Sequence, residues 1–233
     1  MASGPVRFSV PESEVPNIKA VAQASADVLQ ELANALGAEK PALDDRILSA
    51  SLAERTGLAL DVVAPVVSTL CRLAFVQRKL DLSTDVFLQA LATSLRELGT
   101  EQWSSNDAEL LSERQENIAR LLAPDGAIAG GAKAADLLFE QQMVFCKART
   151  LTDMRPVFDE QAQRVQGFLP FHTLALTVHE GTEMREIHMA MDFRDLVRLR
   201  KQLERAEQKE KVLRQNFTEA GLLVIQTGAE SDD

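Results

Sequence analysis

The sequence has no tyrosine, one tryptophan and two cysteines in 233 residues, and each scarcity argues against a class of protein. A platform that stacks the bases of single-stranded nucleic acid needs several exposed aromatic rings, so no such platform is expected. Two cysteines without a CxxC pair argue against a disulfide framework and against structural zinc. We therefore expect Cys71 and Cys146 to be small buried hydrophobic residues.

Long apolar runs and targeting signals are also missing. An apolar run such as Val62–Val67 is far shorter than the roughly 20 residues that cross a bilayer. The first seven residues lack a basic region followed by an apolar one, so neither secretion nor organelle import is predicted. The expectation is a cytoplasmic protein without a transmembrane helix. A hydrophobic content of 45% predicts a folded chain rather than a disordered one.

Positive charge is scarce, because 25 Lys and Arg stand against 35 Asp and Glu and give a formal net charge of −10. A negative chain repels a polyanion at long range, so nucleic-acid binding is not expected. The basic residues gather in residues 192–217, which hold eight Lys or Arg and five Asp or Glu. Residues 218–233 hold four acids and no base, and they are predicted to form a solvated acidic tail.

The first half of the chain carries helical periodicity. Residues 18–142 are predicted to form a helical domain, preceded by a loose lead-in over residues 1–17, where three prolines prevent continuous helix. Gly126, Gly130 and Gly131 predict a flexible joint near residues 125–133. Helices are expected over Ile18–Leu36, from Asp44 or Asp45 to Ala53, from Asp61 onward, from Ser83 to Leu98, from a cap at Asn106 or Asp107 to Leu122, and over Ala134–Glu140.

The pattern then changes to β-branched and aromatic residues, so residues 143–217 are predicted to form a β-β-β-α module. Strand is expected at Met143–Thr150 and at Leu151–Phe158. The segments Phe171–His179 and Glu183–Met191 alternate clearly and are joined by a turn at residues 180–182. They predict an antiparallel hairpin.

A long final helix is expected from Asp192, with Asp195 in the position that completes a capping box. Its apolar side chains form one stripe, which we expect to be buried against the sheet or against a partner subunit. The predicted fold class is α+β, with an N-terminal helical bundle before a three-stranded antiparallel sheet and a long helix. The predicted dimer and packing interface consists of Leu174, Leu176, Val178, Ile187, Met189, Leu196, Leu199, Leu203 and Ala206.

Three stretches of this module resemble the COMM domain, the C-terminal module of the COMM-domain-containing proteins. They are Leu151–Phe158 for the first strand, His172–His179 for the second, and Ile187–Leu203 for the third strand and the start of the helix. The resemblance covers about a third of the chain, and the alanine-rich composition is more typical of a bacterial relative than of an animal one. It implies a preceding helical domain, dimers paired through sheets and helices, a scaffold role such as the family has in eukaryotic endosomal sorting, and no catalysis.

Residues suited to catalysis or metal binding do not form a recognisable site. His172, His179 and His188 fall on predicted strands, where His179 and His188 are expected to face one another while His172 points to the other side. Because at most two histidines converge, no metal site is predicted. The motifs GxSxG, GxGxxG, HExxH and the Walker motif are absent, so no catalytic or cofactor-binding residue is assigned and no cofactor is expected.

The main functional prediction is a non-enzymatic interaction adaptor or scaffold that oligomerises, most simply as a dimer, or pairs with related COMM-like proteins. The alternative is a DNA-binding regulator, because residues 52–70 resemble a helix-turn-helix with Gly57 at the turn. An enzyme whose site leaves no motif is a third possibility. The second helix of the motif is expected to expose Ala59, Asp61, Val62, Pro65 and Thr69, with no Arg, Lys, Asn or Gln before Arg72.

Overall fold

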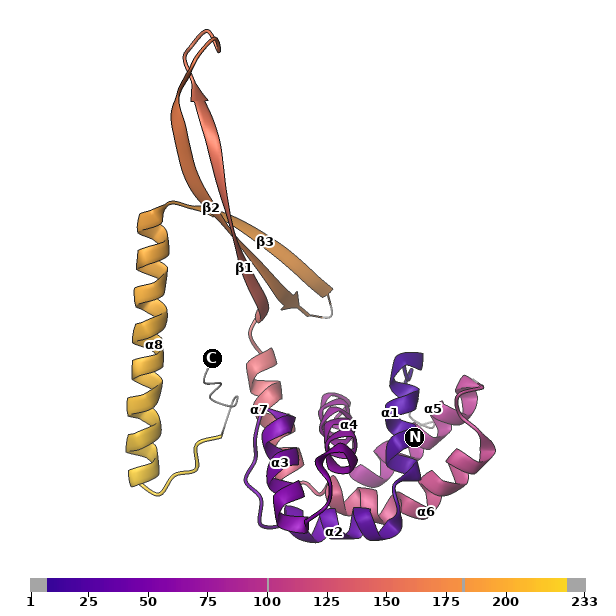
Figure 1. The fold of residues 1–233 in the computed structure, drawn as a ribbon. Coiled ribbons are helices and arrows are strands. Elements are labelled where there is room, and N and C mark those ends of the chain that lie inside the picture. The colour runs from indigo at the N-terminus through magenta and orange to yellow at the C-terminus, as the bar shows by residue number, and fades with distance from the viewer. Residues whose placement is uncertain (1–7, 100, 182, 226–233) are drawn as a thin grey trace, which may run out of the picture. The chain divides into compact units, whose positions relative to one another are not determined.

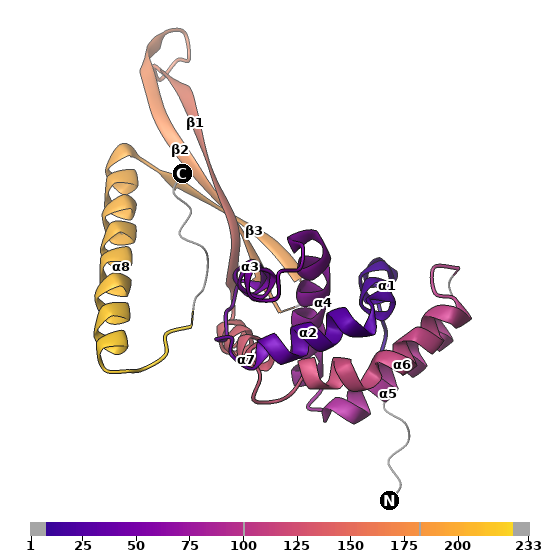
Figure 2. The same cartoon turned by 60° about the horizontal axis from the view of Figure 1, so that its bottom comes forward.

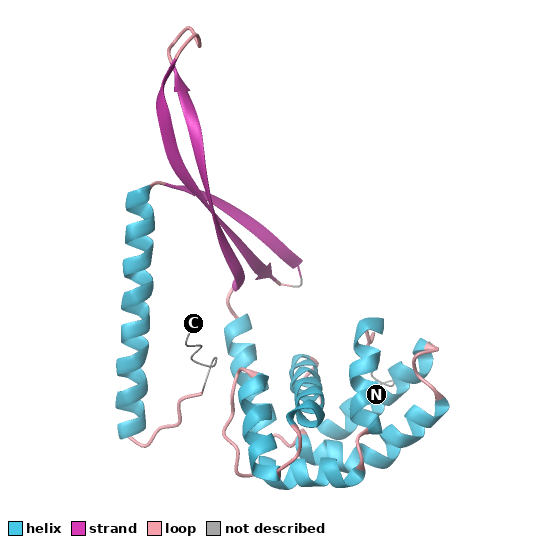
Figure 3. Cartoon of the chain, viewed as in Figure 1, coloured by secondary structure: helices cyan, strands magenta, loops and turns pink. Residues whose placement is uncertain are grey.

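The computed structural model of the protein describes residues 8–99, 101–181 and 183–225. The chain divides into two compact units, the first reaching to Leu137 and the second comprising Leu138–Val224. Helices come first, three strands follow and a helix comes last, so the predicted α+β class is confirmed (Figures 1 and 3). The predicted acidic tail lies outside the described residues from residue 226 onward.

The first unit is helical. Its described residues form a short 3-10 helix, η1, and seven α-helices, of which α7 ends just beyond the boundary at Leu137. Their bounds are η1 (Glu12–Glu14), α1 (Val15–Gln23), α2 (Ala26–Leu36), α3 (Asp45–Thr56), α4 (Leu60–Lys79), α5 (Thr84–Leu98), α6 (Ser105–Leu121) and α7 (Ala127–Phe139).

The N-terminal helices differ from the expected ones at Pro16 and Ser25. The single helix expected from Ile18 is wrong, because Ser25 accepts a hydrogen bond from the Val28 amide at 3.2 Å and so caps a separate helix, α2. The predicted lead-in over residues 1–17 is also too long, because α1 already begins at Val15. Pro16 lies in the first turn of α1, where a helix does not need the amide hydrogen that proline lacks.

Side-chain caps set the starts of α3 and α6, whereas Ser83 precedes α5 without a side-chain cap hydrogen bond. Asp44 accepts a hydrogen bond from the Arg46 amide at 2.9 Å at the start of α3, and Ser83 precedes α5, both as predicted. The expected cap of α6 at Asn106 or Asp107 is wrong. Ser104 is the cap, and Asp107 accepts from its backbone amide to complete a capping box.

The glycine pair Gly130–Gly131 lies inside α7, so the predicted flexible joint is wrong. A β-carbon at Gly130 would lie 2.6 Å from the Cγ of Pro41, and one at Gly131 would lie 2.5 Å from the carbonyl oxygen of Ala42. Neither distance leaves room for a side chain. The two glycines therefore allow α7 to pack directly against the segment that leads into α3.

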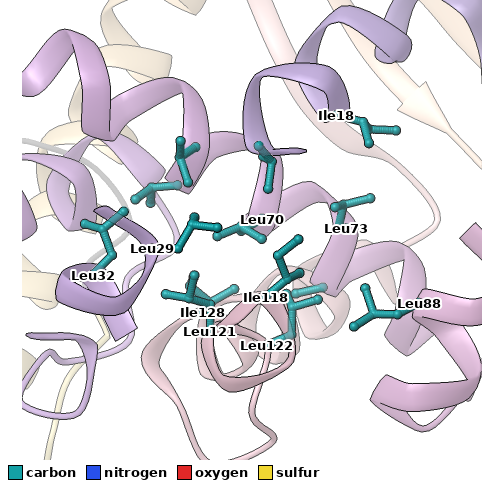
Figure 4. Packing of buried hydrophobic residues seen from close by; sticks show 14 of the residues in the cluster. Ile18, Leu29, Leu32, Leu70, Leu73, Leu88, Ile118, Leu121, Leu122 and Ile128 are labelled. Atoms are coloured by element: carbon teal, nitrogen blue, oxygen red, sulfur yellow. The ribbon is translucent and has the colours of Figure 1, made fainter. Parts of the chain in front are cut away.

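Apolar side chains from all seven α-helices form one core in the first unit (Figure 4). The helix α4 packs against α1 and α3, and its buried apolar residues Val63, Val66, Val67, Leu70, Leu73 and Ala74 lie on one side of the helix. By length and composition alone α4 would also suit a membrane span, with a mean hydropathy of 1.5 over its most apolar window, of which 39% is buried. Its neighbours identify it as a core helix of this unit.

The second unit is an antiparallel sheet in the order β1-β2-β3 followed by one helix. The elements are β1 (Val144–Phe158), β2 (Val165–Glu180), β3 (Glu183–Met191) and α8 (Phe193–Glu219). One continuous strand, β1, covers the two segments expected at its place, and β2 begins six residues before Phe171. Pairing of β2 with β3 confirms the predicted hairpin, and Gly181 adopts the left-handed conformation, with φ +65°, that its turn requires.

The pairing register places six large apolar residues of β2 and β3 on one side of the sheet. Leu176 lies opposite Ile187, and Leu174 lies opposite Met189. On the other side, the Arg149 guanidinium forms an ion pair with Glu186 at 3.0 Å. We call the apolar side the sheet face; it consists of Leu174, Leu176, Val178, Ile187, Met189 and Met191.

Candidate interaction surface

The final helix, α8, begins one residue after β3. The Asp192 side chain accepts a hydrogen bond from the Asp195 amide at 2.9 Å, and the Asp195 side chain accepts one from the Asp192 amide at 3.2 Å. This pair confirms the predicted capping box. The hydrogen bond from the Asp195 amide also holds the pKa of the Asp192 carboxyl below its usual range. The start of α8 is therefore fixed next to the sheet.

The apolar side chains of α8 lie on one stripe that the single chain leaves exposed. Leu203 is 56% exposed and Leu213 is 52% exposed. The structure describes every residue of α8, and none of them is buried. We call this surface the helix stripe; it consists of Leu196, Leu199, Leu203, Ala206, Leu213 and Phe217.

The expectation that the helix and the sheet of one chain bury one another is therefore wrong. Figures 1 and 2 show α8 standing apart from the sheet. The connection explains the difference, because Asp192 alone separates β3 from α8. A link of one residue provides no loop that would let the helix turn back across the sheet face. Burial of the helix stripe against a partner subunit stays a prediction.

Beyond the end of β3, strands β1 and β2 continue together as a two-stranded ribbon (Figure 1). We call this ribbon the arm; it comprises residues 153–158 and 165–171. Met154 and Phe168 lie on the same side as the sheet face and are 61% and 62% exposed, whereas Leu169 lies on the other side and is 56% exposed. A ribbon of two strands has no core of its own. Exposed apolar residues on both of its sides are typical of a surface that contacts another protein.

The residues of the arm are absent from the predicted interface. No strand was predicted over Val165–Pro170, although the apolar residues Val165, Phe168 and Leu169 lie close together there. A tight turn joins the two strands of the arm. The Asp159 amide donates to the Arg164 carbonyl at 3.0 Å, and the Asp159 side chain accepts from the Gln163 amide at 2.8 Å. These two hydrogen bonds close the turn, so β1 and β2 form one long hairpin.

Prolines interrupt both edges of the arm. Pro156 lies in β1 opposite Phe168, and Pro170 lies in β2 just beyond His172, the last residue that pairs with β3. Proline has no amide hydrogen, so sheets accept it at edges, where the missing donor faces solvent. A further strand on either edge would find no donor at these positions. The arm is therefore suited to contacts through its two sides.

The helices α3 and α4 form the helix-turn-helix arrangement, with Gly57 at φ +73° in the turn. Thr69 is not exposed as expected: it is buried, and its hydroxyl donates to the Pro65 carbonyl at 2.7 Å. The first exposed hydrogen-bond donor along the outer side of α4 is Arg72, which lies 3.4 Å from a carboxylate oxygen of Glu14. Before it, the exposed positions are Leu60, Asp61, Val62 and Pro65, which offer no donor to a base edge.

The histidines do not converge. His172 and His179 lie on opposite sides of β2, as predicted. His188 pairs with Ala175 whereas His179 pairs with Met184, so the expectation that these two histidines face one another is wrong. Four residues of strand separate them, which is about 13 Å. Across residues 8–99, 101–181 and 183–225, no group of three or more His, Cys, Asp or Glu is arranged to hold a metal ion.

The two cysteines differ in their surroundings. Cys71 on α4 is half-buried, and burial raises the pKa of its thiol to about 12. Cys146 is exposed, contrary to expectation. It lies where the register shifts between Phe145 and Lys147, and a residue at such a bulge is left out of the strand pairing.

Comparison with known proteins does not assign a family, because the chain matches no protein-family model and no curated protein. The candidate site therefore rests on the geometry of the second unit. Its parts are the helix stripe, the sheet face and the arm.

Proposed function

We propose that the protein is a non-enzymatic interaction adaptor or scaffold that oligomerises through its second unit, most simply as a dimer. The observation that carries the proposal is the exposure of the helix stripe in a single chain. Among the described residues of this unit, only Leu174, Ala175 and Val178 are buried. So small a core is weak support for a unit of this size, and a second copy would add the missing burial.

The helix stripe of one copy is suited to the sheet face of another. From Leu196 to Phe217 the stripe is about 32 Å long at the rise of an α-helix. The strand β1 is about 50 Å long, so the sheet face and the arm together are long enough to receive it. A two-fold exchange of helices would cover both surfaces in both copies. The resemblance to the COMM domain supports the same arrangement, because that family pairs through its sheets and helices.

Light scattering of the full-length protein at micromolar concentration tests the proposal. The expected mass is twice the chain mass of 25.6 kDa. Leu203→Glu places a charge in the middle of the helix stripe and is expected to yield monomers. Because Leu203 is exposed in the single chain, this variant should keep its helix content, which circular dichroism checks.

Arg198→Gln is the matched control for Leu203→Glu. Arg198 lies on the opposite side of α8, and its side chain is 79% exposed. This variant should keep the oligomeric mass. A wild-type mass of one chain, or an equal loss of mass in the two variants, would contradict the proposal.

A further inference from the structure

A row of basic side chains lies along α8, and the proposed oligomerisation does not use it. We call it the basic row; it consists of Arg194, Arg198, Lys201, Arg205 and Lys209, which are all exposed. At 100° per residue the row lies about 130° around the helix from the helix stripe. It is about 22 Å long at the rise of an α-helix. A dimer that buries the helix stripe leaves this side of α8 open.

The charges of the basic row are not neutralised by the helix that carries them. From one end of the row to the other, no Asp or Glu lies on this side of α8, which the structure describes in full. Lys201, Arg205 and Lys209 form no ion pair with the described residues. Arg198, near the start of the row, lies 3.7 Å from a carboxylate oxygen of Asp195.

Such a row weakens its own helix. Its members follow one another at steps of three or four residues, and like charges at this spacing destabilise a helix. Elsewhere on α8 opposite charges are paired, because Arg200 lies 3.4 Å from Glu204 and Arg214 lies 2.6 Å from Glu210. A chain with a formal net charge of −10 does not need this row for solubility. A negatively charged partner would account for it.

We infer that the basic row binds an acidic helix of another protein. A helix that carries Asp or Glu at the same spacing can lie along α8 and pair with the row over its whole length, as charged side chains do between the helices of a coiled coil. The row is narrow, because Asp195 and Glu204 lie on its two flanks. A broad anionic surface, such as a membrane or a DNA duplex, would also approach these carboxylates and the acidic chain, whereas a single helix reaches the row alone.

Fluorescence anisotropy with labelled peptides and the full-length protein tests the inference. The probe is an alanine-based peptide of about 24 residues, long enough to form a helix in water, with five glutamates at the spacing of the basic row. A second peptide has the same composition, but its glutamates are spread around all sides of the helix. The first peptide should bind saturably at low salt and about tenfold more tightly than the second. No saturable binding of the first peptide, or equal affinity for the two, overturns the inference.

A pair of double variants assigns the binding to the basic row. Lys201→Glu with Arg205→Glu reverses two charges in its middle and should weaken the binding of the first peptide about tenfold or more. Lys40→Glu with Lys133→Glu changes the net charge equally at exposed positions of the first unit, so it should leave the affinity within about twofold of wild type. Equal losses in the two variants, with helix content retained, would refute the assignment.

Light scattering separates this inference from the proposed oligomerisation. The variant with Lys201→Glu and Arg205→Glu should keep the mass of the wild type, because the basic row lies away from the helix stripe. A loss of mass would place the row in the oligomer interface and overturn the inference. A monomeric wild type that binds the peptide would contradict the proposed oligomer and support the basic row.

Duplex DNA and phosphatidylserine vesicles are the competing partners. Neither should bind as tightly as the first peptide at the same salt concentration. Tighter binding of either one, lost in the variant with Lys201→Glu and Arg205→Glu, would overturn the choice of an acidic helix.

Discussion

Replacement of Asp107 by alanine is expected to destabilise the first unit strongly. The carboxylate is only 1% exposed and joins α1 to the start of α6. It accepts hydrogen bonds from the Ser104 amide at 2.9 Å, the Ser104 hydroxyl at 2.7 Å and the Gln23 side chain at 2.9 Å. The Lys19 ammonium lies 2.9 Å from the same carboxylate.

The cost follows from the donors that Asp107→Ala leaves behind. A hydrogen bond to a charged group contributes about 1.5–3 kcal/mol, and the variant removes those that the Ser104 amide and the Gln23 side chain donate to the carboxylate. The Lys19 side chain is 34% exposed, so it can return to water and contributes little to the cost. We expect a loss of about 3–4 kcal/mol in the free energy of unfolding, a large part of the roughly 5–15 kcal/mol of a typical domain.

Urea denaturation of the full-length protein, followed by Trp103 emission, measures this loss. Glu109→Ala is the control, because Glu109 is an exposed carboxylate in the same part of α6, and it should change the stability by less than about 0.5 kcal/mol. If Asp107→Ala costs no more than Glu109→Ala, the buried hydrogen bonds do not stabilise the unit and the reasoning is refuted.

The pH dependence of the loss provides a second measurement. Burial acts to raise the pKa of Asp107, but the hydrogen bonds from Ser104, Lys19 and Gln23 outweigh it and hold the pKa well below its usual range. A carboxyl with a lowered pKa in the folded state contributes its full stability above its unfolded pKa of about 3.9 and loses it as the pH falls toward the folded value. The difference between wild type and Asp107→Ala should therefore be constant from about pH 5 to 7 and shrink below about pH 4.

Three further outcomes are expected. Gly131→Ala should lower the free energy of unfolding by about 1–3 kcal/mol in chemical denaturation, because the added β-carbon would meet the Ala42 carbonyl. This loss is expected even though alanine favours helix. Gly167→Ala is the control, because Gly167 has open space around it, and it should not show this loss. A thiol reagent near neutral pH should modify one cysteine per folded chain quickly and the second only on unfolding, and Cys146→Ser should abolish the fast reaction. The protein should not be retained on DNA at low salt; retention that falls steeply with added salt would favour the helix-turn-helix alternative.

The sequence was sufficient to predict the start of a helix where one capping side chain fixes it. Asp44 and Asp192 each cap a helix as predicted, because a cap acts on amides only two or three residues away. The sequence was not sufficient at Gly130–Gly131, since a pair of glycines is compatible with a mobile loop and with close packing alike. The contact with Pro41 and Ala42 decides between the two, and the sequence does not show that contact.

The sequence predicts which residues share the candidate surface, but it does not predict whether that surface is buried or exposed in the single chain. Alternation in β2 and β3 correctly placed Leu176 with Ile187, because strand periodicity reports which side chains share a side. It does not report what covers that side. The exposure of Leu203 depends on the single residue between β3 and α8. Helical periodicity predicts which side chains share a side of the helix, but not whether that side packs against the sheet. The arm was missed because its second strand contains Pro170, which weakens the local signal for a strand.

Pro156 and Pro170 also bear on the aggregation of newly made chains. An apolar ribbon with open edges is the kind of segment from which identical chains grow fibrils by adding strand to strand. A missing donor on each edge of the arm opposes that growth, because an added strand finds no amide hydrogen at Pro156 or Pro170. The two prolines therefore act against aggregation through the edges of the arm, even while its apolar sides are exposed.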